Sequence, residues 1–271
     1  MLTSTFVLLP GIGRATERRL WQEGLLDWQR FMKQPLVNGF SPDRKSLCDR
    51  ELALAQSQFD GRHLHLLASR LQTREHSRFY DTCRSRTVYL DIETTGASPR
   101  DGDVTVVGLH RNERTISLVQ GETLTADRLQ EEFDQCELLV TFFGTGFDVP
   151  YLRAKFPDLR LPIPHFDLCF AARRLGLRGG LKHIEQEVGI EREASLRDLD
   201  GWDAVRLWSR WRRGDYAALD LLVAYNAADT QNLVPLAALA YEEMMSRFGP
   251  ASVGISPRPT SFHTAPVACS R

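Results

Sequence analysis

Two acidic residues, Asp91 and Glu93, lie two positions apart in the segment YLDIETTG. The residues before them are β-branched and aromatic, which predicts a strand, and side chains two apart on a strand project from the same face. Two carboxylates on an otherwise apolar strand are costly unless a cation neutralises them. Oxygen ligands of this kind favour Mg²⁺ or Mn²⁺. The alternative is that one acid begins the turn at ETTG and the other is merely exposed.

A further acid, Asp148, follows a predicted buried strand at 138–143 and opens a predicted helix in the segment GFDVPYL. Val149, Leu152 and Phe156 would give this helix a face towards the core. The position is compatible with a metal ligand. It is also compatible with an aspartate that only caps the helix N-terminus.

The last acid of interest, Asp229, lies in the long helical segment YNAADTQNLVPLAALA. Tyr225 precedes it by four residues, so the two side chains share one helix face. A carboxylate among apolar neighbours needs a cation or strong hydrogen bonds, and the Tyr225 hydroxyl is available at the same surface. A capped or ion-paired helix acid is the alternative interpretation.

Taken together, an acid-x-acid strand, an FD pair at a helix start and a Tyr-x-x-x-Asp helix occur in a fixed order along the chain. In this order they resemble the DnaQ-like exonucleases of the ribonuclease H-like superfamily, in their DEDDy branch, and most closely the YprB-like proteins. The resemblance covers roughly residues 85–245, including the segment HFDLCFAARRLGLRGGLKHIEQEVGI. Ala224 stands where the sister branch carries a histidine, so Tyr225 places the site in the tyrosine branch.

The resemblance implies an α/β fold, a ribonuclease H-like mixed sheet flanked by helices. It also implies a site for two divalent cations, Mg²⁺ or Mn²⁺, in which Asp91 bridges both ions. Glu93 and Asp229 would complete the coordination shell of the first ion. Asp148 would bind the second ion, partly through water. Tyr225 would position the attacking water. The implied activity is 3′-to-5′ exonucleolytic hydrolysis of phosphodiester bonds in DNA or RNA, without a covalent protein intermediate.

One residue departs from the family pattern. The second motif usually reads YNGxxFD, with an asparagine that helps hold the terminal nucleotide, whereas this chain has Phe143 in FFGTGFD. The departure concerns substrate handling and leaves the metal ligands intact. Phe143 is predicted to stack on a base instead, since aromatic side chains bind single strands without sequence preference. Further nucleic-acid contacts are expected at Lys182, near a predicted helix start, and at Thr95 and Gly96 after the first motif.

The amino-terminal segment LPGIGRATERRLWQEGL resembles a helix-hairpin-helix element, in which a glycine-hydrophobic-glycine turn lets backbone amides approach a phosphate. Gly11 and Gly13 permit the close approach, and Arg14 adds positive charge. The alternative is a glycine turn between packed helices. We expect three segments: a small all-helical module over 1–84, the exonuclease domain over 85–248, and a disordered tail over 249–271, which is rich in Pro, Ser and Thr.

The elements that would position these residues follow from local patterns. A turn-rich connection is expected over 33–46, a helical stretch over 47–78, and an antiparallel meander with a turn at 111–114. A helix over about 125–133 and mostly helical text up to 248 complete the prediction.

The bulk composition fits a folded enzyme with an accessory module. The chain has 271 residues, is 42% hydrophobic and has a formal net charge of -1. Positive charge is local: residues 61–86 hold six arginines against two acids, and residues 153–182 hold seven basic residues against two acids. Such stretches could bind a polyanion or could be solvated helix faces. The five scattered cysteines and the short apolar start predict a cytoplasmic protein with neither disulfides nor a membrane partner.

The expected partner is therefore nucleic acid, as a single strand or a 3′ end of DNA or RNA. Two other functions remain open. The domain could be a catalytically weak platform that binds nucleic acid, or it could be an endonuclease that cuts structured RNA.

Overall fold

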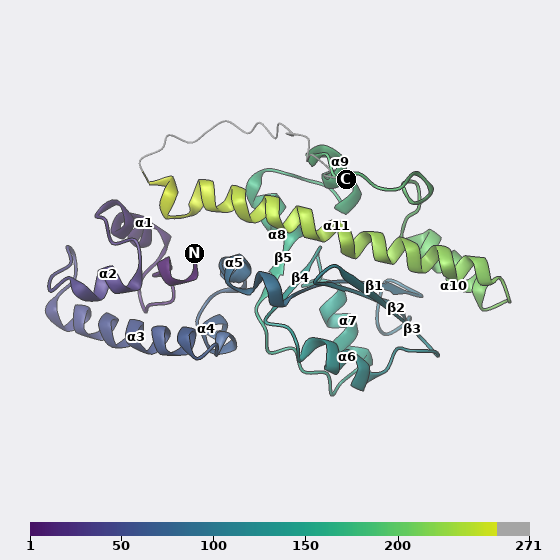
Figure 1. The fold of residues 1–271 in the computed structure, drawn as a ribbon, viewed down its shortest axis with the longest axis horizontal. Helices are drawn as coiled ribbons and strands as arrows, with labels where there is room; N and C mark the ends of the chain where they lie inside the picture. The colour runs from purple at the N-terminus through teal and green to yellow at the C-terminus, as the bar shows by residue number, and fades with distance from the viewer. Residues whose placement is uncertain (254–271) are drawn as a thin grey trace.

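The computed structural model describes residues 1–253, which form an elongated molecule with a helical module at one end (Figure 1). A 3-10 helix, Thr73–Phe79, and the short helix α5 (Tyr80–Cys83) lead from this module into the sheet. The four α-helices of the module are α1 (Arg14–Gln22), α2 (Trp28–Lys33), α3 (Pro42–Asp60) and α4 (Leu64–Ser69).

The sheet contains five strands in the order β3-β2-β1-β4-β5. The pairs β1-β2 and β2-β3 are antiparallel, whereas β1-β4 and β4-β5 are parallel, so the predicted mixed sheet and its antiparallel meander are confirmed. The strands are β1 (Thr87–Thr94), β2 (Val104–Arg111), β3 (Arg114–Val119), β4 (Leu138–Thr141) and β5 (His165–Asp167).

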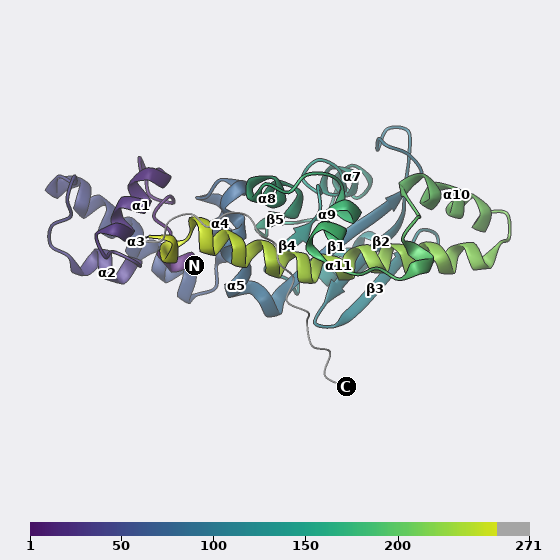
Figure 2. The same ribbon diagram turned by 90° about the horizontal axis from the view of Figure 1, so that it is seen from above.

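Helices cover both faces of the sheet, as Figure 1 and Figure 2 show. Helices α6 and α7 pack on one face, α8, α9 and α11 lie on the other, and α10 pairs with the first part of α11. Their bounds are α6 (Ala126–Phe133), α7 (Asp148–Lys155), α8 (Leu168–Leu175), α9 (Leu181–Val188), α10 (Gly201–Trp211) and α11 (Tyr216–Phe248).

The alternation of side chains along β1 determines which face carries the first acidic motif. Val88, Leu90 and Ile92 are buried in the apolar cluster formed with α6 and α7. The intervening residues therefore face α11, and the two acids, Asp91 and Glu93, project together on that side. The expectation that these carboxylates share one face is confirmed.

A glycine on β2 allows α11 to lie close to this face. Gly108 pairs with Asp91 in the β1-β2 register. A Cβ atom added at Gly108 would lie 2.2 Å from Asn226 Oδ1 and 2.9 Å from Thr230 Cγ2, both on α11. A glycine is therefore required at position 108 for α11, which carries Asp229, to lie close to Asp91 on β1.

Replacing Gly108 by alanine is expected to lower the free energy of unfolding by about 1–3 kcal/mol, because the new methyl group overpacks the contact with α11. Urea unfolding would measure the loss. Gly201→Ala is the matched control, since a Cβ added there meets nothing within 4 Å. Equal stability of the two variants would contradict the tight strand-helix contact.

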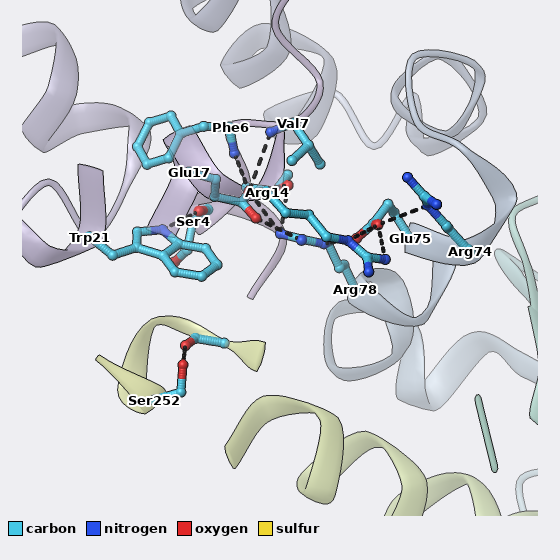
Figure 3. A network of polar contacts seen from close by, with 12 residues as sticks. Ser4, Phe6, Val7, Arg14, Glu17, Trp21, Arg74, Glu75, Arg78 and Ser252 are labelled. Atoms are coloured by element: carbon cyan, nitrogen blue, oxygen red, sulfur yellow. Dashed lines mark hydrogen bonds and ion pairs between the residues drawn. The ribbon is translucent and has the colours of Figure 1, made fainter. Parts of the chain in front are cut away.

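A buried ion-pair network joins the module to the segment that enters the sheet (Figure 3). The Arg78 guanidinium lies between two carboxylates, with Nη2 2.8 Å from Glu17 and Nε 2.8 Å from Glu75. Glu17 also accepts a hydrogen bond of 2.7 Å from the Phe6 amide. These contacts satisfy the buried charges and fix α1 against the 3-10 helix.

The apolar core does not stop at the end of the module. One cluster of buried side chains runs from Trp28 and Phe79 through Tyr89 of the sheet to Leu236 of α11. The module is therefore packed onto the domain that it precedes. Of the predicted tail, Pro250–Ser252 form a 3-10 helix against α11, and residues 254–271 lie outside the described residues.

Several element boundaries differ from the sequence prediction. Helix α3 begins at Pro42 with a Ser41 side-chain cap, so the predicted connection over 33–46 was too long. The predicted helical stretch over 47–78 is interrupted by a turn at Gly61 and Arg62, the latter at a φ of 54°. Strand β5 was not predicted within the mostly helical text up to 248, because three residues are too few to show a strand period.

Within residues 1–253, no helix combines the length and the apolar character needed to cross a bilayer. The four cysteines in this part of the chain are buried free thiols, and burial raises the pKa of Cys136 to about 11. Burial thus disfavours the reactive thiolate form of these side chains.

Candidate active site

The four predicted acids line one cleft of about 240 Å³ beside the carboxyl end of β1. Asp91 and Glu93 come from β1, Asp148 from the first position of α7, and Asp229 from the middle of α11. Tyr225 lines the same cleft one helical turn before the last acid. The other residues that line the cleft are Ile92, Thr94, Phe142, Phe143, Phe147 and Gly201.

Three of the carboxylates form a group that could hold a metal ion. One oxygen from each of Asp91, Glu93 and Asp229 lies within 4.8 Å of the others. Asp148 is held against β1, because its Oδ1 accepts a hydrogen bond of 3.2 Å from the Ile92 amide. The fold thus brings together acids that are separated by more than a hundred residues in sequence.

Burial and mutual repulsion make the ionised carboxylates of the cleft unfavourable without a cation. Burial raises the pKa of Asp91 and of Glu93 well above the usual range, and the nearby Asp229 carboxylate raises both further. Burial also raises the pKa of Asp148 to about 7. A divalent cation among these oxygens would remove the repulsion that favours protonation, so the donor set fits Mg²⁺ or Mn²⁺.

Asn226 is a site residue that the sequence analysis missed. Its Nδ2 donates hydrogen bonds to Asp91 Oδ2 at 2.9 Å and to the Asp91 carbonyl at 3.2 Å. The side chain is fully buried and holds the Asp91 carboxylate in one orientation. Its position directly after Tyr225 was the available signal, because it begins the helix face that turns towards β1.

Arg192 is the second missed residue. Its Nη1 lies 2.5 Å from Asp229 Oδ1, and its Nη2 donates to Glu185 Oε1 at 2.8 Å. Both members of the Glu185 pair are almost completely buried. The surrounding segment, GIEREAS, alternates charge and turn residues, so nothing local indicates that this arginine points inwards. Asp229 therefore has a protein cation beside it as well as two neighbouring carboxylates.

Removing Arg192 is expected to destabilise the metal-free protein. Arg192→Gln leaves Glu185 and Asp229 without their cation, and breaking a buried ion pair in this way costs about 3–5 kcal/mol. Urea unfolding of the single variants and of the double variant with Glu185→Gln would measure this cost. The double variant is expected to lose less than the sum of the single losses; strict additivity would contradict the pairing.

Two cations flank the ring of Tyr225. Lys182 Nζ lies 4.6 Å from the ring centroid and the Arg192 guanidinium carbon lies 5.9 Å from it. Lys182 Nζ is buried and has no hydrogen-bond partner among residues 1–253, and burial lowers the pKa of this amine. The predicted phosphate contact thus lies behind the tyrosine, in a neighbouring pocket of about 300 Å³ that also includes Arg192.

Phe143 lines the cleft and has an unusual backbone. Its φ is 65°, in the left-handed region that asparagine tolerates better than a bulky side chain. Asp167 holds the loop in this shape, accepting hydrogen bonds from the Phe143 amide at 2.8 Å and the Thr145 amide at 2.9 Å. The ring remains 42% exposed. This conformation gives a physical reason for an asparagine at this position in the family pattern.

The remaining predicted contacts lie outside the cleft lining. Thr95 exchanges hydrogen bonds with Asp103, and the Gly96 carbonyl accepts from Tyr151, so both residues shape the loop after β1. Gly11 adopts a φ of 71° and Gly13 precedes the first residue of α1.

Arg14 lies in the amino-terminal module rather than in the cleft. Its Nε donates to Glu75 Oε1 at 2.8 Å, beside the network drawn in Figure 3. The side chain is still 39% exposed. The ion pair therefore leaves part of the guanidinium open to solvent.

Comparison with solved structures gave several similar chains. NrnC of Brucella melitensis with bound Mg²⁺ is 21% identical, with a TM-score of 0.44 over 61% of this chain and 76% of that chain. A structure described as the apo form of the nuclease is 19% identical, with a TM-score of 0.46 over 65% of this chain and 78% of that chain. The family B DNA polymerase of Pyrobaculum calidifontis is 16% identical, with a TM-score of 0.46 over 56% of this chain and 24% of that chain.

Comparison with curated proteins gave no match. A family model for the RNase H superfamily matches residues 88–241, from β1 to the last turns of α11. The matched segment contains the mixed sheet and all four acids of the cleft. Because this match spans more than half of the 271 residues, the chain belongs to the RNase H superfamily.

Proposed function

We propose that the protein is a metal-dependent 3′-to-5′ exonuclease that hydrolyses phosphodiester bonds of DNA or RNA. The observation that carries the proposal is the convergence of Asp91, Glu93 and Asp229 within 4.8 Å, with Asp148 in the same cleft. Carboxylates gathered in this way from separate elements are destabilising in a metal-free protein. Their arrangement is understandable as a binding site for catalytic cations.

Two Mg²⁺ or Mn²⁺ ions held by the four acids would supply an activated water and stabilise the charge that develops on the phosphate. The protein's own groups have separate tasks. Asn226 fixes the orientation of the Asp91 carboxylate. Tyr225, one turn before Asp229 in the same cleft, would position the attacking water. Lys182 and Arg192 add positive charge behind that tyrosine.

Single-stranded DNA and RNA carrying a label at either end, incubated with Mg²⁺ or Mn²⁺, would test the proposal. With a 5′ label, progressive shortening from the 3′ end is expected. Internal cuts on substrates with blocked 3′ ends would instead support an endonuclease. Tight, salt-sensitive binding without cleavage would support the platform function, which the Arg192 to Asp229 ion pair favours because it competes with a metal ion for that carboxylate.

The exposed ring of Phe143 provides a separate prediction. Phe143→Ala is expected to weaken single-strand binding about tenfold, because stacking of one base on an aromatic ring contributes about 1–3 kcal/mol. Fluorescence anisotropy with a labelled oligonucleotide would measure the affinity. Tyr216→Ala is the matched control, since this tyrosine is exposed at the amino-terminal end of α11. Unchanged affinity of the Phe143 variant would remove the stacking role.

A further inference from the structure

Exposed aromatic rings continue from the cleft onto α8. The rings of Phe143 and Phe170 lie 6.3 Å apart, and their side chains are 42% and 45% exposed. The Arg173 guanidinium carbon lies 5.6 Å from the centroid of the Phe170 ring. Large apolar side chains are rarely left exposed side by side, whereas paired rings with an adjacent cation suit the stacking of unpaired bases.

A second pocket begins where these rings end. It has a volume of about 260 Å³ and lies between the 3-10 helix Thr73–Phe79, α8 and the last third of α11. Thr145 and Phe170 line it on the side of the cleft loop, and Arg74 and Arg174 contribute positive charge. Its one acid, Asp167, accepts hydrogen bonds from the Phe143 and Thr145 amides. The Arg74 side chain is 64% exposed. The pocket thus offers apolar contact for a base together with cations for its phosphate.

A third pocket, of about 130 Å³, continues to the amino-terminal module. Arg174 lines it as well, together with Arg14 and Arg18 of α1. Arg78 and Arg247 also line it, together with the acid Glu17, and Arg247 is ion-paired with Glu243 beside the pocket. Because Arg174 belongs to both pockets, the two form one continuous surface from the cleft loop to the module.

Positive charge is in excess along this surface. Glu75 is shared by Arg14, Arg74 and Arg78, and Glu17 pairs with Arg78. Within residues 1–253, Arg174 has no carboxylate at ion-pair distance; its guanidinium instead packs 4.1 Å from the ring of Phe248. Burial, followed by the charge of Arg14, lowers the pKa of Arg174 to about 10. A half-buried cation without an acid is unlike a solvated surface arginine and is suited to an external anion.

The fold also unites the two basic segments of the sequence. Residues 61–86 supply Arg74 and Arg78, and residues 153–182 supply Arg173 and Arg174. These segments are separated by the whole of the antiparallel meander. Helix α8 contacts the 3-10 helix Thr73–Phe79, and Figure 1 shows α8 beside the sheet and the end of α11 alongside the module.

We propose that this surface, from Phe143 and Phe170 through Arg174 to Arg14 and Arg18, binds the unpaired strand on the 5′ side of the scissile bond. The proposal rests on the proposed exonuclease function and names its substrate: a single strand of several nucleotides, rather than a duplex or a dinucleotide. We call this surface the strand track.

Binding to a non-cleaving protein separates the track from catalysis. Fluorescence anisotropy would be measured with Asp91→Asn protein and labelled single strands of about 3 and about 12 nucleotides, and with a 12-base-pair duplex of the same sequence. We expect the 12-nucleotide strand to bind at least about tenfold more tightly than the 3-nucleotide strand or the duplex. Phe170→Ala and Arg18→Glu should each weaken binding of the long strand about tenfold and thereby collapse this preference.

Matched controls lie on surfaces away from the track. Tyr216→Ala replaces an exposed aromatic residue, and Arg50→Glu reverses an exposed arginine on α3. Both should bind the long strand as the parent does. Arg18 is exposed and has no ion-pair partner in the described residues, so Arg18→Glu tests the track even where Phe170→Ala disturbs folding.

The outcomes of this experiment and of the cleavage assay are distinct. Equal affinity for short and long strands, or track variants that bind like the controls, would overturn the strand track even if the protein degrades DNA or RNA. Length-dependent binding that the track variants abolish would support the track even if the parent chain cleaves nothing, a result that would contradict only the proposed exonuclease.

Discussion

Asp91→Asn is expected to lower metal-dependent hydrolysis by about a thousandfold or more while raising the thermal stability of the metal-free protein. The loss follows from the several kcal/mol of transition-state stabilisation that a correctly held cation supplies. The gain follows because the substitution removes one charge from three crowded carboxylates within 4.8 Å. Single-turnover cleavage of an end-labelled strand and thermal unfolding without metal would measure the two effects.

Asp220→Asn is the matched control for this prediction. Asp220 lies on α11 as Asp229 does, but its side chain is exposed to solvent. Neither activity nor stability should change in this variant. An Asp91→Asn protein that cleaves at the parental rate would show that the cleft is not the catalytic site, and one that is less stable would show that Asp91 has a mainly structural role.

The second large effect concerns pH and metal binding. The pKa of Asp148 is raised to about 7 by burial, far above that of an unfolded aspartate. Between about pH 4 and 7 the folded chain therefore keeps a proton that the unfolded chain has released, so this group makes the metal-free protein less stable as pH rises. Bound Mg²⁺ or Mn²⁺ should reverse the trend, because the cation favours the ionised carboxylates.

Asp148→Asn isolates this contribution. Three half-buried histidines act in the opposite direction, since burial lowers the pKa of His165 to about 4 and also lowers the pKa values of His76 and His110. Because the histidines are present in both proteins, their contribution cancels when the stability of the parent is subtracted from that of the variant. Without metal, the stability advantage of the variant should grow by a few kcal/mol from pH 5 to 8, at about 1.4 kcal/mol per pKa unit. A constant difference would contradict the raised pKa.

Local periodicity indicated which acidic residues share a face, and their order along the chain supplied the resemblance that marked them as one site. The two-residue period of β1 put Asp91 and Glu93 on one face, and the four-residue spacing on α11 linked Tyr225 to Asp229. The same logic could not find Arg192, which reaches Asp229 from an irregular segment between α9 and α10. Side chains in irregular segments have no period, and their direction is decided by long-range packing.

Backbone conformation was equally hidden from sequence patterns. Phe143 was recognised as a departure from an asparagine pattern, but its left-handed φ depends on Asp167, a residue of a strand too short to predict. Strand β5 exists because β4 offers it a parallel edge, which is a tertiary effect. The mixed sheet with its antiparallel meander and most of the cleft residues were therefore predictable from the sequence, whereas the groups that orient the cleft residues were not.

Helix α11 sets the distance between the cleft and the amino-terminal module. It carries Asp229 at the cleft and Arg247 beside the amino-terminal module, eighteen residues later in the same helix. At a rise of 1.5 Å per residue these positions are about 27 Å apart, which corresponds to about eight nucleotides at a stacked spacing of 3.4 Å. On the proposed strand track, a strand longer than this would contact both the cleft and the amino-terminal module, whereas a shorter strand would contact the cleft alone.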